Sequence, residues 1–212
     1  MTRRFGVDEA GKGPVLGSMF AAAVVCDPEA LPEGVRDSKR LAPARREELD
    51  ERIRDVAAVG VAEIAVERID DPETDMNALT VAAQAEALDA VAADGLAGTV
   101  DAGDVDEARF GRRVAADVDA DVELVAEHGA DDAHPLVSAA SVVAKVARDA
   151  HVDALSEEYG AVGSGYPSDP ATRDFLREYV REHGELPACA RASWATSRDV
   201  LAAADQSSLA DF

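Results

Sequence analysis

An uninterrupted apolar segment near the N-terminus constrains the fold of this chain more than any other feature. It runs from Ser18 to Val25 and follows a short strand-like stretch, Arg4–Val7, from which a glycine-rich loop separates it. The segment is far shorter than the roughly 20 residues that a membrane-spanning helix needs. Its unbroken apolar character instead predicts a strand that is buried on both faces of a sheet.

Segments with strand-like and helix-like patterns alternate after this start. Strands are predicted at 61–69, 98–101 and 122–126, and helices at 43–56, 77–93, 106–118, 135–159, 170–183 and 193–204. The first two strands can pair as direct neighbours, whereas the later ones need helical crossovers. We therefore expect an α/β fold in which helices flank a mixed five-stranded sheet, with extra C-terminal helices. One domain is expected over residues 1–200, followed by a short tail over residues 201–212.

Composition narrows the class of protein. Of the 212 residues 47% are hydrophobic, which excludes a disordered chain. The two cysteines, Cys26 and Cys189, lie far apart, so neither a disulfide framework nor a thiolate metal site is indicated. The N-terminus carries no signal-peptide core. We expect a cytoplasmic monomer without a membrane partner.

The charge is strongly acidic, with 43 Asp and Glu against 21 Lys and Arg and a net charge of −22. Such acidity usually argues against a nucleic-acid partner, because phosphates repel it. Only three of the cations are lysines, however, and this bias resembles proteins from cells with near-molar internal salt. There the Debye length is about 3 Å, so the charge excludes no ligand. Charge alone does not separate a high-salt protein from a plain acidic one.

Two adjacent carboxylates stand at the predicted end of the first strand. Asp8 and Glu9 are followed by Gly11, Lys12 and Gly13, and glycines beside a lysine let backbone N–H groups approach an anion. Carboxylates next to a phosphate-binding loop are what a metal-dependent phosphoryl-transfer site needs. The alternative is a solvated turn with incidental acids.

Five motifs, in order along the chain, resemble ribonuclease HII, and its archaeal branch in particular. They are GVDEAGKGPVLG from residue 6, RDSKRL from residue 36, VDA from residue 100, ADD from residue 130 with VSAASVVAK from residue 137, and GSGYPSDP from residue 163. The similarity covers roughly residues 4–198. It implies a ribonuclease H-like fold that hydrolyses the RNA strand of RNA–DNA hybrids. It further implies cleavage 5′ of single ribonucleotides in duplex DNA, leaving 5′-phosphate and 3′-hydroxyl ends.

The resemblance implies a site of four carboxylates, Asp8, Glu9, Asp101 and Asp131, that binds Mg²⁺ or Mn²⁺. Two divalent ions clamped by bridging carboxylates activate a water and neutralise the leaving oxygen of a phosphodiester. Hard oxygen ligands suit both metals. Because crowded carboxylates repel one another, at least one pKa is expected to rise without metal.

Two of these ligands have alternatives. Asp101 is a candidate helix cap, with Asp104 or Asp106 as rivals for the cap of the next helix. Asp131 has its neighbour Asp132 as a rival ligand.

The resemblance also implies how substrate is recognised. The loop of Gly11, Lys12 and Gly13 would sense the 2′-hydroxyl that distinguishes RNA from DNA, although the family mostly has Arg where this chain has Lys12. Arg offers a planar fork and Lys a point charge, so a contact specific to Arg is in question. Tyr166 would lie against the sugar after the ribonucleotide; its alternative is a core residue with the hydroxyl outward.

Lys39 and Lys145 are the best phosphate-binding candidates, because lysine is rare here and both lie in motifs. Their alternative is solubilising surface charge.

The tail carries Gln206, Leu209 and Phe212 at positions i, i+3 and i+6. This spacing resembles a box that docks on the replication sliding clamp. The alternative is a frayed C-terminus.

Two other functions stay open at this point. One is a DNA nuclease of the same fold, such as a junction resolvase. The other is a non-catalytic nucleic-acid-binding adaptor recruited through the tail to the clamp.

Overall fold

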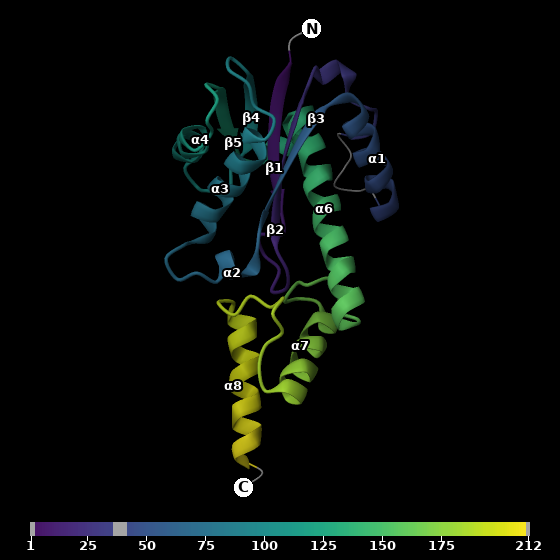
Figure 1. The fold of residues 1–212 in the computed structure, drawn as a ribbon, viewed down its shortest axis with the longest axis vertical. Helices are drawn as coiled ribbons and strands as arrows, with labels where there is room; N and C mark the ends of the chain where they lie inside the picture. The colour runs from purple at the N-terminus through teal and green to yellow at the C-terminus, as the bar shows by residue number, and fades with distance from the viewer. Residues whose placement is uncertain (1–2, 36–41, 211–212) are drawn as a thin grey trace.

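The two N-terminal strands, β1 (Arg4–Ala10) and β2 (Met19–Cys26), form the centre of the sheet (Figure 1). In this computed structural model, which describes residues 3–35 and 42–210, the strand order is β3-β2-β1-β4-β5. The other strands are β3 (Ala58–Ile64), β4 (Ala97–Asp101) and β5 (Glu123–Glu127). Pairing is antiparallel from β3 through β1 and parallel from β1 through β5, which confirms the mixed sheet.

Every residue of β2 is buried, as its apolar run predicts. Alternate side chains serve two cores: Ala21, Ala23 and Val25 face one, and Ala22 and Val24 face the other. Because both faces are covered, the strand has no room for a polar residue.

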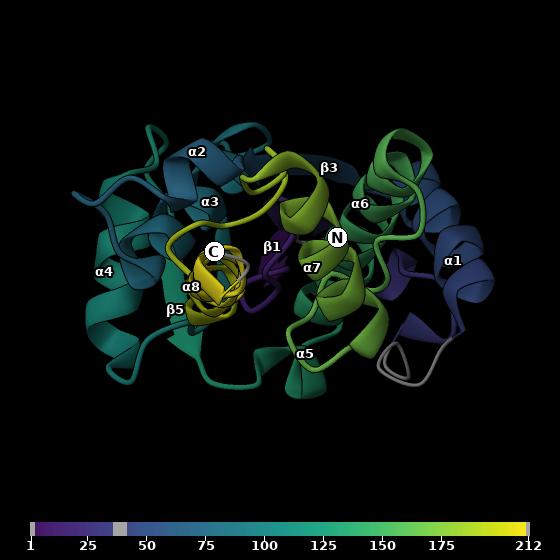
Figure 2. The same cartoon turned by 90° about the horizontal axis from the view of Figure 1, so that it is seen from below.

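Helices cover the two faces of the sheet. On one face lie α3 (Met76–Asp89) and α4 (Glu107–Ala116), and on the other α1 (Pro43–Val56) and α6 (Pro135–Tyr159), as Figure 2 shows from below. Gly6 lets α6 lie directly on β1, since a Cβ at this position would stand 2.2 Å from the carbonyl carbon of Leu136. This close approach fixes α6 against the strand that carries Asp8.

The C-terminal helices, α7 (Pro170–His183) and α8 (Ala195–Ala210), lie beyond one end of the sheet (Figure 1). A third apolar cluster, including Leu16, Leu155 and Leu176, joins this part to the loop between β1 and β2. A short bridge pairs Leu16 with Ala190, and the Gly17 N–H donates to the Cys189 carbonyl at 2.8 Å. The extra helices are thereby tied to the loop that follows the first carboxylates.

Several predicted boundaries were wrong. β1 continues past Val7 to Ala10, and β3 covers residues 58–64, while residues 66–69 form the short helix α2 (Val66–Ile69). The sequence did not predict the start of β3, because Gly60 carries no strand signal. Glycine is needed at this position, since a Cβ there would stand 2.1 Å from the Ala87 carbonyl oxygen. Helix α8 extends to Ala210 and not to Ala204, so residues 201–210 continue it.

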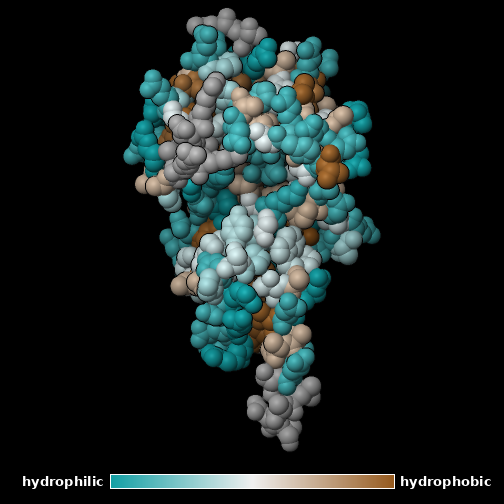
Figure 3. All heavy atoms as spheres, turned by 180° about the vertical axis from the view of Figure 1, so that it is seen from behind, coloured by the Kyte–Doolittle hydropathy of each residue, from teal (hydrophilic) through white to brown (hydrophobic). Residues whose placement is uncertain are grey.

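The remaining short elements are η1 (Pro28–Ala30) and α5 (Ala130–Ala133). Both cysteines are buried free thiols. No helix in residues 3–35 and 42–210 is long and apolar enough to cross a membrane. Figure 3 shows a largely hydrophilic face with only scattered apolar spots.

Candidate active site

Three of the predicted carboxylates converge at the ends of two parallel strands. Val7 of β1 pairs with Val100 of β4, so Asp8 and Asp101 are the next residues on neighbouring strands. Ligand oxygens of Asp8, Glu9 and Asp101 all lie within 4.8 Å of one another. Such a group of buried or half-buried oxygens fits a divalent cation, which favours hard oxygen ligands.

The side chains of Asp8 and Glu9 have partners in different helix layers. Asp8 has the Ser141 hydroxyl of α6 as a hydrogen-bond partner, and its Oδ1 accepts the Glu9 N–H at 2.8 Å. Glu9 Oε2 accepts from Nε2 of Gln84 on α3 at 2.6 Å. Gln84, which is fully buried, also donates to the Asp101 carbonyl at 2.9 Å. One amide on α3 therefore orients residues from both strands.

The electrostatics of this group confirm the expected rise in pKa. Burial raises the pKa of Asp8 well above its usual range, and the charges of Glu9 and Asp101 raise it further. Burial raises the pKa of Glu9 to about 7, against the hydrogen bond from Gln84 and the charge of Lys12, which lower it. Carboxylates that are costly to ionise alone are ready to accept a cation, whose charge offsets their repulsion.

Asp131 lies in α5 beside this group but is not one of its three members. The N–H of Ala130, the preceding residue, donates to Asp101 Oδ1 at 2.7 Å. Asp131 is half-buried, whereas its rival Asp132 is exposed. The role of Asp131 as a ligand stays a prediction.

A neighbouring residue, and not Asp101, caps the helix that follows β4. Asp106 is the N-cap of α4, since its side chain accepts the Arg109 N–H at 2.9 Å. Asp104 is buried and bonds the Arg109 guanidinium. Asp101 itself belongs to the carboxylate group, and its Oδ1 accepts the N–H of Ala130.

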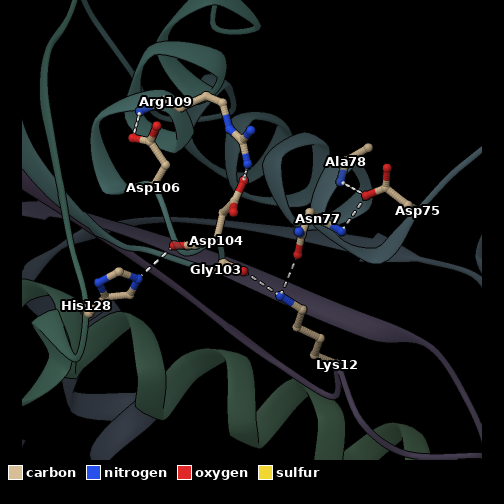
Figure 4. A network of polar contacts seen from close by, with 9 residues as sticks. All are labelled: Lys12, Asp75, Asn77, Ala78, Gly103, Asp104, Asp106, Arg109 and His128. Carbon is tan, nitrogen blue, oxygen red and sulfur yellow. Dashed lines mark hydrogen bonds and ion pairs between the residues drawn. The ribbon is translucent and has the colours of Figure 1, made fainter.

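Lys12 reaches from the loop after β1 to the segment after β4 (Figure 4). Its Nζ donates to the Gly103 carbonyl at 2.8 Å and lies 3.5 Å from Asn77 Oδ1 at the start of α3. In this structure the ammonium links the loop to the strand end that carries Asp101. An ammonium with three donors retains capacity for an anion beside these contacts.

A groove of about 540 Å³ adjoins the carboxylates. Its lining includes Glu9, the loop of Gly11, Lys12 and Gly13, and the predicted residues Lys145 and Tyr166. Tyr166 is 44% exposed, so its ring is accessible from the groove, and its contact with a sugar stays a prediction. Lys145 donates to Ser141 Oγ at 2.6 Å, so it lies next to the partner of Asp8.

Sequence reasoning undervalued or missed other residues around this groove. Arg46 and Arg148 also line it, although the sequence pattern singled out only lysines as phosphate-binding candidates. Gln84 lies in the helix predicted at 77–93 but in no motif that marks a site. Arg191 also lies outside every motif, and it is a fully buried arginine that donates to carbonyls of the glycine loop. Nothing local in the sequence distinguishes it from the other arginines.

The RDSKRL segment lies wholly outside the described residues and the C-terminal tail partly so. Lys39 and Phe212 lie outside the described residues. Gln206 is exposed on α8, and Leu209 belongs to the same helix.

Comparison with known proteins settles the family. A family model described as Ribonuclease HII matches residues 5–197. The chain belongs to the ribonuclease HII family. It is 72% identical over 210 residues to the ribonuclease HII of Halobacterium salinarum, with 99% of each chain covered. This similarity confirms the resemblance and agrees with a high-salt origin of the acidic composition.

Solved structures confirm the fold. The ribonuclease H2 of Pyrococcus horikoshii is similar with a TM-score of 0.90 and 36% identity, covering 97% of this chain and 100% of that one. The ribonuclease HII of Archaeoglobus fulgidus, solved in complex with PCNA, has a TM-score of 0.83 and 38% identity, covering 90% and 94%.

Proposed function

We propose that the chain is a metal-dependent endoribonuclease that hydrolyses the RNA strand of RNA–DNA hybrids. It also cuts 5′ of single ribonucleotides embedded in duplex DNA, leaving 5′-phosphate and 3′-hydroxyl ends. The observation that carries this proposal is the convergence of Asp8, Glu9 and Asp101 beside a groove lined by the glycine loop and Tyr166.

Mg²⁺ or Mn²⁺ would be held by Asp8, Glu9 and Asp101, with Asp131 as the fourth ligand. When bound, such ions activate the attacking water and neutralise the leaving oxygen. Gln84 keeps Glu9 in place through its hydrogen bond, and Ser141 does the same for Asp8. The protein's own contribution at the cut is thus a rigid arrangement of oxygens that need not reorganise during reaction.

Substrate selection belongs to the groove. Backbone groups of Gly11, Lys12 and Gly13 sense the 2′-hydroxyl, and Tyr166 packs on the next sugar, where a deoxyribose fits its flat ring. The ring lies near the loop, since a Cβ on Gly13 would be 3.8 Å from Tyr166 Cε1. Lys145 and Lys39 bind phosphates and position the duplex without reading its sequence.

The exposed C-terminal helix suits recruitment to a sliding clamp. The relative from Archaeoglobus fulgidus was solved with PCNA, which is such a clamp. Gln206, Leu209 and Phe212 would supply the contacts of this chain. We place the working monomer in the cytoplasm, where the chromosomal substrate of an archaeal cell lies.

The test is cleavage of a labelled DNA duplex that contains one ribonucleotide, in concentrated KCl with Mg²⁺ or Mn²⁺. An all-DNA duplex and the Asp8→Asn variant run alongside, with Asp199→Asn on the exposed face of α8 as the matched control. A single cut 5′ of the ribonucleotide by wild type and Asp199→Asn alone supports the proposal.

Equal cutting of the all-DNA duplex would instead identify a general DNA nuclease. Binding without cutting, by folded protein at several salt concentrations, would identify a non-catalytic adaptor.

A further inference from the structure

Arg191 places a buried guanidinium directly behind the glycine loop. Its Nη2 donates to the Gly11 carbonyl at 2.6 Å, its Nη1 to the Lys12 carbonyl at 3.0 Å, and its Nε to the Gly17 carbonyl at 2.8 Å. The residue is 0% exposed and has the largest fully buried side chain in the part of the chain that the structure describes. Burial lowers the pKa of Arg191 to about 10, so it keeps its charge at neutral pH.

Trp194 completes the contact with the loop. Its indole Nε1 donates to the Gly13 carbonyl at 3.3 Å, and its ring centroid lies 4.9 Å from Arg191 Cζ. Three successive loop carbonyls, those of residues 11, 12 and 13, therefore accept hydrogen bonds from one short C-terminal segment.

Because peptide bonds are planar and trans, these contacts also fix the direction in which the loop N–H groups point. In each peptide unit the N–H points opposite to the C=O. Since the carbonyls of Gly11 and Lys12 face Arg191, the N–H groups of Lys12 and Gly13 are turned to the other side. Successive N–H groups of this kind form an anion- and oxygen-binding concavity. The carbonyl of Gly13 precedes Pro14, which has no N–H to present.

The same segment also fixes the loop relative to Tyr166. The Gly165 carbonyl accepts the N–H groups of Val15 and Leu16 at 2.8 and 3.2 Å. The Arg191 N–H in turn donates to the Val15 carbonyl at 2.8 Å. Residues 15–17 thus connect the glycine loop, the residue before Tyr166 and Arg191 in one hydrogen-bonded unit.

Asp70 anchors the segment from its other side. Its carboxylate accepts the N–H groups of Ala192 and Ser193 at 2.7 and 2.9 Å. The position of Arg191 is therefore set by contacts that are independent of the groove.

We propose that Arg191 is a positioning residue that turns the N–H groups of the glycine loop toward the ribonucleotide and sets the spacing between that loop and Tyr166. The inference rests on the proposed function of the same groove. Because the hydrogen bonds of the Arg191 guanidinium go to backbone carbonyls and its ring contact is Trp194, it acts on selectivity and rate without touching substrate or metal ligands.

The experiment compares Arg191→Lys and Arg191→Met with matched changes at the exposed Arg198 on α8. Lysine keeps the charge but does not bridge three carbonyls, and methionine fills the space without donors. We measure kcat and KM on the single-ribonucleotide duplex, hydrogen exchange of residues 11–17, and the Mn²⁺-induced rise in Tm.

The expected result for Arg191→Met is a loss of about 100-fold, mainly in kcat, which is typical of a misplacement near 1 Å. In Arg191→Met the amides of residues 11–17 exchange faster, while the rise in Tm with Mn²⁺ persists. The kcat and the loop exchange of Arg191→Lys lie between those of wild type and Arg191→Met. The Arg198 variants behave as wild type.

Unchanged kcat and loop exchange in a folded Arg191→Met would overturn the inference. So would loss of the Mn²⁺ response or of cooperative unfolding in both Arg191→Met and Arg191→Lys, because Arg191 would then support the whole fold. Failure of wild type to cut at the ribonucleotide would refute the proposed function instead, so the two failures are distinguishable.

Discussion

Replacing Glu9 by glutamine is expected to stabilise the metal-free protein above neutral pH, although it removes a proposed ligand. The pKa of Glu9 is raised from 4.5 to about 7, mainly by burial. Folded protein therefore holds the proton more tightly than unfolded protein, and the free energy of unfolding falls as pH rises from about 4.5 to about 7. The pKa of Glu9 rises by about 2.5 units. At pH 8 this limits the loss in the free energy of unfolding to about 3 kcal/mol.

The uncharged amide avoids this cost and still offers an oxygen to Gln84 Nε2, so the hydrogen bond at 2.6 Å can persist. For a chain of this size this limit corresponds to a rise in Tm of at most about 6–12 °C at pH 8. At pH 4.5, where Glu9 is protonated in the folded state, the two proteins are expected to unfold alike.

The assay is thermal unfolding in concentrated KCl with a chelator, at pH 4.5 and pH 8. Glu185→Gln, on an exposed residue, controls for the loss of one negative charge. Adding Mn²⁺ at pH 8 is expected to reverse the order, raising the Tm of wild type more than that of Glu9→Gln. The reasoning is refuted if wild type and Glu9→Gln lose stability equally between the two pH values.

Three further substitutions test the glycine loop and the close packing of β1 against α6. Lys12→Met removes a charge that lowers the pKa of Glu9, so the pH window in which metal-free stability falls should extend to higher pH; identical unfolding curves would show that Glu9 does not feel Lys12. Gly6→Ala places a Cβ 2.2 Å from the α6 backbone and should lower the free energy of unfolding in urea by about 1–3 kcal/mol. A Cβ at Gly13 would have only Tyr166 Cε1 nearby, at 3.8 Å, so Gly13→Ala should slow cleavage while the stability stays unchanged. Equal stability of the two glycine variants would contradict the packing argument.

The fold was predictable where the hydrophobic pattern of a segment fits only one kind of secondary structure. The apolar run of β2 predicted a strand covered on both faces, and the order of elements predicted a mixed sheet. The predicted start of β3 was wrong, because Gly60 carries no strand signal. A glycine is needed there because the backbone of α3 packs too closely for a side chain. The prediction was also wrong at residues 66–69, where Val66 and Ile69, three residues apart, suit one face of a helical turn as well as a strand.

The carboxylates were predictable for a different reason. Asp8 and Asp101 each follow the last residues paired between β1 and β4, Val7 and Val100, and this parallel pairing brings the two aspartates together. Arg191 had no comparable signal, because its partner Gly11 is 180 residues away and arginine is common in this chain. Its burial depends on how the C-terminal segment meets the β1–β2 loop, which no local pattern encodes.

The groove also shows how an acidic chain can hold a polyanion. Lys12, Lys145 and Arg148 line it, but so do acids such as Asp149, which pairs with Arg46 at 2.6 Å. With a screening length of about 3 Å at molar salt, attraction beyond direct contact is negligible, and release of counterions adds little affinity. Recognition must then come from hydrogen bonds whose donors are already in place before substrate arrives. A loop fixed from behind by a buried guanidinium supplies such donors without relying on long-range charge, and this makes rigidity, more than net charge, the property on which substrate binding depends.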